Sequence, residues 1–248
     1  MNSKIFSPEA FTDLLQALIG SGRTWTGFED QSSRPCGRLR VDVDYDLELA
    51  VDLARLIHQA GLSATFFLRV GADSYNPFSS AGCRAVCVLS DLGQRIGLHT
   101  SPEAIDLPRL EHEFGLLKML SAESVPVVSW HNPGADLGAA NDVARASGFV
   151  CTYDQAFFSP ESYVSDSNMA RQPAKIRDFV IQCSEPNMQV LVHPLTWIIG
   201  GEKMEHALDE VFRRGVYKVM TGLEENDIWR SRLGSAWKRR FLLDSDEN

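Results

Sequence analysis

Three carboxylates follow a short run of alternating apolar and polar residues early in the chain. Residues 39–43 alternate in this way, which predicts a β-strand. Asp42 and Asp44 are two residues apart, so an extended backbone points both side chains to the same face. Two like charges this close repel unless a cation or a shared proton relieves them, which favours a divalent metal with a neighbouring base. An acidic turn that caps the next helix is the competing interpretation, because Asp46 suits an N-cap position.

Three of the six histidines and one further aspartate also follow short apolar segments that have the character of strands. These residues are His99, His131, Asp166 and His193. Core histidines have no reason to share one end of the strands, so the recurrence favours a common site. Each residue also has a plain structural explanation, since His131 begins an Asn-Pro-Gly turn and His193 could be a hydrogen-bonded histidine at a strand end.

The elements that position these residues alternate along the chain. Predicted strands cover residues 39–43, 64–68, 95–98, 125–130, 149–153, 163–165, 179–181 and 190–192. Predicted helices begin at Ser7, after Asp46 and at residues 85, 107 and 139. Repeated strand–helix alternation in a domain of this size predicts a (β/α) barrel, whose chemistry lies at the C-terminal ends of the strands.

The length of 248 residues predicts one domain, residues 1–248. A helix at 7–20 and a helical tail at 202–241, interrupted near Gly215 and Gly222, are expected to pack on the barrel. The net charge of −9 argues against a nucleic-acid or anionic-membrane surface, and no apolar run has the length of a membrane span. Five cysteines without metal-finger spacing, and an N-terminus without a signal peptide's apolar region, favour the cytoplasm. The sequence does not indicate an oligomeric state.

Six segments between residues 39 and 194 form one recognisable set of motifs. They are Val-Asp-Val-Asp at 41–44, Gly-Leu-Ser-Ala-Thr-Phe-Phe at 61–67, Ile-Gly-Leu-His-Thr at 96–100, Ser-Trp-His-Asn-Pro-Gly at 129–134, Tyr-Val-Ser-Asp at 163–166 and Leu-Val-His-Pro at 191–194. This set resembles the polysaccharide deacetylase superfamily, carbohydrate esterase family 4. More narrowly, it resembles the deacetylase-like proteins encoded in bacterial O-antigen and surface-polysaccharide gene clusters.

The resemblance implies a fold, an activity and a set of roles. The fold is a distorted seven-stranded (β/α) barrel, and the activity is metal-dependent N- or O-deacylation of a sugar. By motif position, Asp44 and His99 would bind a divalent metal, most readily Zn²⁺. Asp42 would be the general base, His193 would protonate the leaving group, and Asp166 would orient His193.

Two positions depart from the motifs of the superfamily. The second histidine of the second motif is replaced by Glu103, and the arginine of the third motif is replaced by His131. Either residue could complete the metal site. We favour His131 because it follows a strand, whereas Glu103 suits the first turn of a helix that begins near Ser101.

The leading function is therefore a cytoplasmic deacetylase acting on an acetylated amino sugar, a nucleotide-linked sugar or a glycan intermediate in surface-polysaccharide assembly. A barrel that binds a sugar or a partner protein without catalysis, its metal site having decayed, is the main alternative. Removal of a different acyl group, such as formyl, is a third.

Several other residues near the predicted site have two interpretations. Tyr45, Trp130 and Trp197 could stack against a sugar ring or simply pack at the mouth of the barrel. For Arg40, Arg69 and Arg171, contact with a substrate phosphate competes with surface salt bridging, which is the more ordinary role of an arginine. The sequence assigns no function to these six residues.

Overall fold

The computed structural model describes residues 5–30 and 35–237. The chain divides into two compact units, Met1–Met204 and Glu205–Asn248. The first unit contains every predicted site residue. The prediction that the whole chain is one domain stays a prediction.

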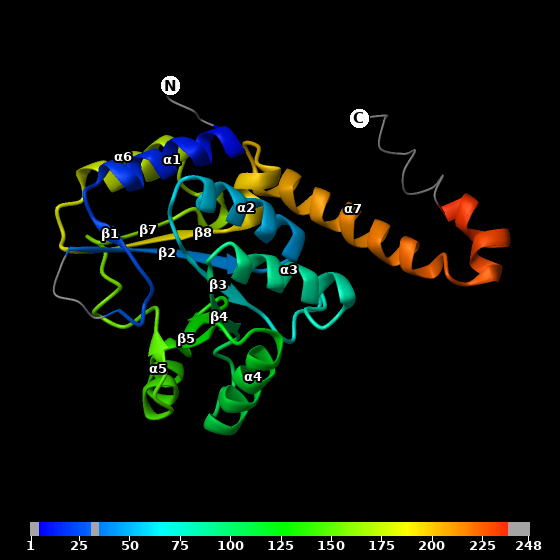
Figure 1. Cartoon of the computed structure of the whole chain (residues 1–248), viewed down its shortest axis with the longest axis horizontal. Coiled ribbons are helices and arrows are strands. Elements are labelled where there is room, and N and C mark those ends of the chain that lie inside the picture. Colours follow the sequence, from blue (N-terminus) through cyan, green and yellow to red (C-terminus); the bar gives the residue numbers. More distant parts are fainter. Residues whose placement is uncertain (1–4, 31–34, 238–248) are drawn as a thin grey trace. The chain divides into compact units, whose positions relative to one another are not determined.

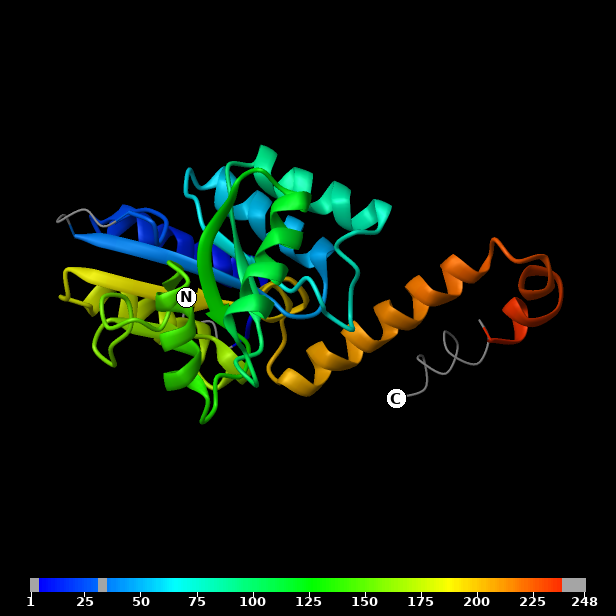
Figure 2. The ribbon, with the colours of Figure 1, turned by 90° about the horizontal axis from the view of Figure 1, so that it is seen from below.

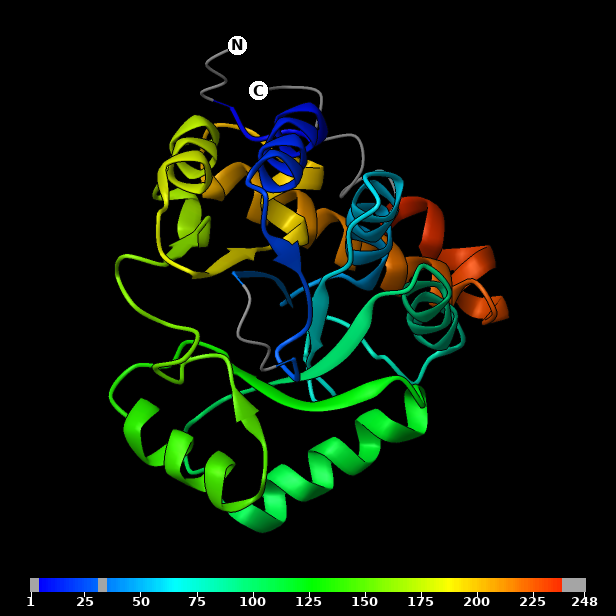
Figure 3. The same ribbon diagram turned by 60° about the vertical axis from the view of Figure 1, so that its left-hand side comes forward.

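The first unit is built on one curled sheet of parallel strands (Figures 1 and 3). The strands are β1 (Thr24–Trp25), β2 (Cys36–Val43), β3 (Thr65–Leu68), β4 (Arg95–Thr100), β5 (Ser124–Trp130), β6 (Val150–Cys151), β7 (Tyr163–Ser165) and β8 (Asn187–Val192). Along the sheet the order is β6-β5-β4-β3-β2-β8-β7, and β1 pairs with β2 outside this path. The strands β6 and β7 end the path at its two edges. The sheet is therefore a distorted seven-stranded (β/α) barrel, as predicted.

Helices connect the strands and cover the outside of the sheet. They are α1 (Pro8–Gly20), α2 (Leu47–Gln59), α3 (Ser80–Asp91), α4 (Leu107–Leu120), α5 (Leu137–Ala146) and α6 (Pro173–Gln182). The predicted helix starts at Ser7 and after Asp46 are confirmed, because each of these side chains accepts a backbone hydrogen bond from the first helical turn. Helices α1 and α6 lie side by side (Figure 1).

The central strand β2 is buried along its whole length, and its two faces differ in character. Leu39, Val41 and Val43 belong to the main hydrophobic core. Arg40 and Asp42 alternate with them and are buried on the opposite face, inside the barrel. The sequence alternation therefore separates a packing face from a polar interior face, and the interior face leads directly to the site.

Two predicted elements are wrong. Residues 179–181 belong to helix α6 instead of a strand, because Pro173 starts the helix and Ile176 and Val180 bury one face at a spacing of four residues. The helix α7 (Met204–Leu223) is continuous through Gly215, where an interruption was predicted, and it ends directly after Gly222, near the second predicted interruption (Figure 2). A glycine in a helix costs only about 1 kcal/mol relative to alanine, which the surrounding helix-forming residues offset.

The second unit also contains a short π-helical turn, Trp229–Leu233. The last residues of the predicted 202–241 tail, from 238 onward, lie outside the described residues. None of the described helices combines the length and the apolar character needed to cross a membrane.

Gly97 provides a test of the barrel interior. A Cβ atom at this position would lie 2.6 Å from the ring of Phe67, which is fully buried on the neighbouring strand. We expect Gly97→Ala to lower the free energy of unfolding by about 1–3 kcal/mol, as overpacking does. Gly115→Ala is the control, because a Cβ in that helix meets no atom within 4 Å and should be neutral or stabilising. Urea denaturation of both variants measures the difference; equal stabilities would contradict this packing.

Candidate metal centre

The six predicted site residues come together at the C-terminal rim of the barrel. Asp44 lies 3.0 Å from His99, 3.1 Å from His131 and 3.8 Å from His193. An oxygen of Asp42 lies 3.9 Å from Nε2 of His99. Asp166 completes the group through a 2.5 Å contact with Nδ1 of His193, described below. The last residues of β2 and β4, together with the loops after β2, β5, β7 and β8, therefore supply one connected cluster.

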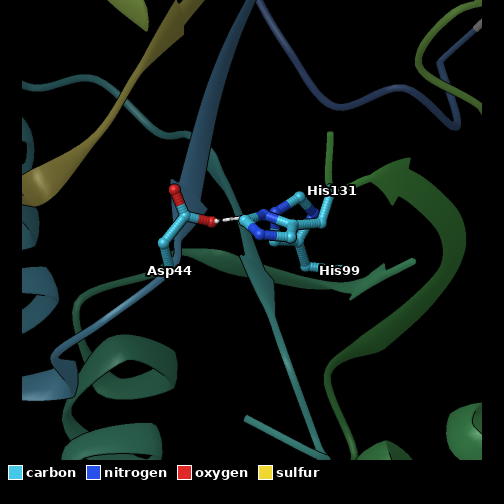
Figure 4. A group of neighbouring side chains, drawn as sticks. All are labelled: Asp44, His99 and His131. Carbon is cyan, nitrogen blue, oxygen red and sulfur yellow. Dashed lines mark hydrogen bonds and ion pairs between the residues drawn. The ribbon is translucent and has the colours of Figure 1, made fainter. Parts of the chain in front are cut away.

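Asp44, His99 and His131 form a possible metal-binding triad, with donor atoms that all lie within 4.8 Å of one another. Figure 4 shows the Asp44 carboxylate directed at the two imidazole rings, which overlap in this view. Two nitrogens and one oxygen are a ligand set typical of catalytic zinc sites. Ligands of a tetrahedral zinc are roughly 3.4 Å apart. The two distances from Asp44, 3.0 Å to His99 and 3.1 Å to His131, are close to this spacing. The residues present therefore fit a divalent ion.

The hydrogen bonds of His99 strengthen this assignment. Its Nδ1 lies 2.9 Å from the carbonyl oxygen of Ser129, and since a carbonyl only accepts, Nδ1 carries the proton. Nε2 faces an oxygen of Asp44 at 3.0 Å, so this pair needs positive charge: either a second proton on the ring, which then donates to Asp44, or a cation between the two atoms. The site is thus built to hold positive charge.

His131, which follows β5, also contacts Asp44, through Nδ1. The other ring nitrogen of His131 lies 3.1 Å from the side-chain amide of Asn132. By contrast, Glu103 is exposed in a turn, and it is outside the described cluster of donor atoms. The helix expected near Ser101 begins only at Leu107, with Asp106 as its N-cap, so a helix start does not explain Glu103 either.

Burial would raise the pKa of the Asp44 carboxyl, but hydrogen bonds from His131 and His99 hold it well below its usual range. Asp44 is therefore ionised at neutral pH. An ionised carboxylate is the form that binds a metal.

Arg40 is a site residue that sequence reasoning placed wrongly. It is not at the surface: it is fully buried, and Nε and Nη2 donate to the two oxygens of Asp42 at 2.9 and 2.7 Å. Ser129 also donates to the Asp42 carboxylate. The available signal was the spacing, because residues two apart on a strand share a face. Burial would raise the pKa of Asp42, whereas the Arg40 guanidinium keeps it low.

The guanidinium of Arg40 is held from its other side by residues that the sequence analysis missed. It donates to the hydroxyl of Tyr153 at 3.1 Å and to the side-chain oxygen of Gln189 at 3.4 Å. The amide of Gln189 donates to the carbonyls of Thr152 and Phe157, both at 2.9 Å. No local pattern predicts these contacts, since Gln189 is 149 residues from Arg40 in the chain. The network ties the segment after β6 to the strand that carries Asp42.

His193 is oriented by Asp166, which is completely buried. One oxygen of Asp166 accepts from Nδ1 of His193 at 2.5 Å, and the other accepts from the His193 backbone and from the indole of Trp197. Burial would lower the pKa of His193, but the nearby Asp166 carboxylate, with Asp44, raises it to about 9. Trp197 lies in the π-helical turn Leu195–Ile199, and its side chain is completely buried. It therefore packs in the core and cannot stack against a sugar.

Trp130 is also a packing residue, because it is buried and its indole donates to Asn141. Tyr45 remains half-buried at the rim. Together with Asp42, Asp44 and His193 it lines a cavity of about 10 Å³, which has room for about one water molecule. The two carboxylates and the imidazole thus surround a space of the size that a hydrolytic water needs.

Backbone strain is concentrated on this same rim. Among the described residues, four that are not glycine have positive φ: Ala104, Asn132, Asn168 and Met169. Ala104 follows β4, Asn132 follows β5, and the other two lie in the short helical turn Ser167–Met169 after β7. Residues in sparsely populated conformations of this kind gather at functional sites, which agrees with the position of the cluster.

No family model matches the chain, and no curated protein matches its sequence. Among solved structures, a chitin deacetylase from Colletotrichum lindemuthianum is 13% identical with a TM-score of 0.45, covering 74% of this chain and 84% of that one. The catalytic domain of a peptidoglycan N-acetylglucosamine deacetylase from Eubacterium rectale ATCC 33656 is 13% identical with a TM-score of 0.44, covering 78% and 89%. A CE4 family pseudoenzyme from Bacillus anthracis is 14% identical with a TM-score of 0.42, covering 75% and 62%.

The chain therefore spans less than two thirds of the length of the pseudoenzyme. A mutant of that pseudoenzyme with restored enzymatic activity is also similar in structure, at 14% identity and a TM-score of 0.43. The pseudoenzyme and its mutant are described as CE4 family proteins.

Single replacements identify the metal ligands. We expect Asp44→Ala, His99→Ala and His131→Ala each to weaken zinc binding by more than about 100-fold, since even changes to residues that only orient a ligand cost 10–100-fold. Glu103→Ala is the matched control and should bind zinc like the unmodified protein. Zinc competition against a chromophoric chelator measures all four affinities. If the Glu103 variant lost affinity for zinc and the His131 variant did not, Glu103 would be the third ligand in place of His131.

Removal of Arg40 tests the buried ion pair. Arg40→Met leaves the Asp42 charge buried without its partner, and we expect it to lower the free energy of unfolding by about 3–5 kcal/mol. The double variant Arg40→Met/Asp42→Leu removes both charges and should be less destabilised than the single variant. Urea denaturation compares the two. If the double variant is less stable than the single variant, the loss of stability does not come from an unpaired charge on Asp42.

Proposed function

We propose that this chain is a metal-dependent deacetylase that hydrolyses the amide or ester bond between an acyl group and a sugar. The observation that carries the proposal is the convergence of Asp44, His99 and His131, with Asp42 and His193 beside them. Two imidazoles and a carboxylate converge there, and Asp42, Asp44 and His193 line a water-sized cavity beside them. The ligand set and the neighbouring acid and base are those that hydrolysis of an amide or ester requires.

Zinc is the ion that the proposal favours. Two imidazoles and one carboxylate leave a fourth tetrahedral position for water or substrate. A zinc ion in that place would polarise the acyl carbonyl and acidify water. Ser129 and Asn132 support the proposed ligands, because each contacts the ring nitrogen that faces away from Asp44. In the structure the amide nitrogen of Asn132 faces Nε2 and donates to it. With Nδ1 of His131 as ligand, Nε2 would carry the proton and the Asn132 amide would be turned to present its oxygen.

The proton transfers are assigned to Asp42 and His193. Asp42 would take the proton of the attacking water, since its carboxylate lines the small cavity and Arg40 keeps it ionised. His193 would give a proton to the departing amine or hydroxyl, since its ring is held by Asp166 and its Nε2 points toward Asp44. Base and acid thus border the same space, which suits a single hydrolytic step.

The sugar substrate rests on the motif resemblance. That resemblance suggests an acetylated amino sugar, either free, nucleotide-linked or within a glycan intermediate of bacterial surface-polysaccharide assembly, and a cytoplasmic location. Deformylation would use the same residues on a smaller acyl group. Both activities fall within hydrolysis of carbon–nitrogen bonds other than peptide bonds.

A non-catalytic sugar- or partner-binding barrel is the second candidate. The observation in its favour is the engagement of Asp42, which is buried and accepts hydrogen bonds from Arg40 and Ser129. In this function Asp42 would be a structural residue of the barrel interior. Zinc binding without any turnover of acylated sugars would favour it.

The decisive experiment replaces the proposed base. With zinc bound, we expect hydrolysis of N-acetylglucosamine oligomers or nucleotide-linked N-acetyl sugars, followed by the appearance of free amine. Asp42→Asn should lower kcat by roughly 10²–10⁴-fold, because it removes general-base catalysis, while zinc stays bound. Asp52→Asn, an exposed carboxylate on α2, is the control and should retain full activity. Unchanged turnover in the Asp42 variant would remove this residue from the mechanism.

A further inference from the structure

Arg69 is a cation on the rim for which the proposed hydrolysis has no use. It follows β3, the strand between those that lead to Asp44 and His99. The strand register pairs the residues that directly precede these three. Arg69 is therefore level with Asp44 and His99 in one row of the sheet, and residues in one row leave the sheet on the same face.

Arg69 is half-buried as a residue, and its guanidinium has no hydrogen-bond or ion-pair partner among the residues that the structure describes. Its backbone is fixed, because its N–H donates to the Tyr75 hydroxyl at 2.8 Å and Tyr75 donates to the Val43 carbonyl at 2.9 Å. Arg69 is thus anchored at the mouth of the barrel, after the strand that neighbours the one leading to Asp44.

The carboxylates of the site already have positive partners. Arg40 pairs with Asp42 and His193 with Asp166, while the third carboxylate faces the proposed ion. Arg69 is then an additional positive charge in a chain whose net charge is −9. A fixed positive charge without a counter-ion at the mouth of a site attracts an anion from solution.

We propose that Arg69 binds an anionic group of the substrate, a carboxylate or a phosphate, beside the acylated sugar ring. The planar guanidinium matches either group with two parallel hydrogen bonds. The position of the sugar rests on the proposed function, but the anion site does not. The substrate class becomes an acylated sugar with negative charge, such as a sugar phosphate, a nucleotide-linked sugar or a uronic acid unit. Neutral amino-sugar polymers would bind weakly.

The test measures binding of three sugars without an acyl group, so that nothing is hydrolysed. Glucose 1-phosphate, glucuronic acid and methyl glucoside are titrated calorimetrically into the zinc-loaded protein. Arg69→Gln removes the charge, and Arg69→Lys keeps the charge without the two-pronged geometry. Arg171→Gln is the matched control, because Arg171 is an exposed arginine beyond β7 that lies outside this row.

We expect at least one anionic sugar to bind roughly tenfold or more tightly than methyl glucoside, the scale of a charged hydrogen bond. Arg69→Gln should abolish this preference, Arg69→Lys should reduce it, and Arg171→Gln should retain it. The preferred anion distinguishes a phosphate from a carboxylate substrate. Equal binding of all three sugars, or a preference that survives in Arg69→Gln because the anion binds zinc alone, would overturn the proposal.

The two proposals fail separately. A protein that hydrolyses acylated sugars without any anion preference would keep its deacetylase function and lose the Arg69 subsite. A protein that binds anionic sugars through Arg69 but never releases an amine would keep the subsite and lose the deacetylase function.

Discussion

A carboxylate oxygen and an imidazole nitrogen lie 3.0 Å apart at the rim of this barrel. Asp44 and His99 are held in this position by the fold, since His99 is buried and its other nitrogen is committed to the Ser129 carbonyl. The arrangement is favourable only when positive charge lies between the two atoms. The third donor, His131, comes from the neighbouring strand β5, which makes a divalent ion the fitting occupant.

Next to the metal site, the barrel interior contains a buried polar network around the charged Asp42. A buried carboxylate is stable only with a hydrogen-bonded cation, and Arg40 supplies one from the same strand. Gln189 and Tyr153 then fix Arg40 from the far side. The same contacts hold the segment that bridges the two unpaired edges of the sheet, β6 and β7. Closure of the barrel and orientation of the proposed base are therefore one network.

The proposed acid is supported by a different part of the chain. Asp166 accepts three hydrogen bonds, two from His193 and one from Trp197. The ring of Trp197 packs against Phe6 and Phe11, at centroid distances of 4.8 and 5.2 Å. Helix α1, which precedes the barrel, thus stabilises the turn that follows His193. A substitution on the buried face of this helix would reach the site through direct packing on Trp197.

The sequence by itself determined most of the strand–helix alternation, the rim on which the chemistry lies, and five residues of the cluster, because these follow from local periodicity and strand ends. Only the tertiary structure decided between His131 and Glu103 as neighbours of Asp44, and only it revealed Gln189, Tyr153 and the burial of Arg40. Those contacts join strands far apart in the chain, and local patterns carry no information about which distant side chains meet. The continuous helix α7 was missed for a related reason, since the cost of each glycine is small against the helix as a whole.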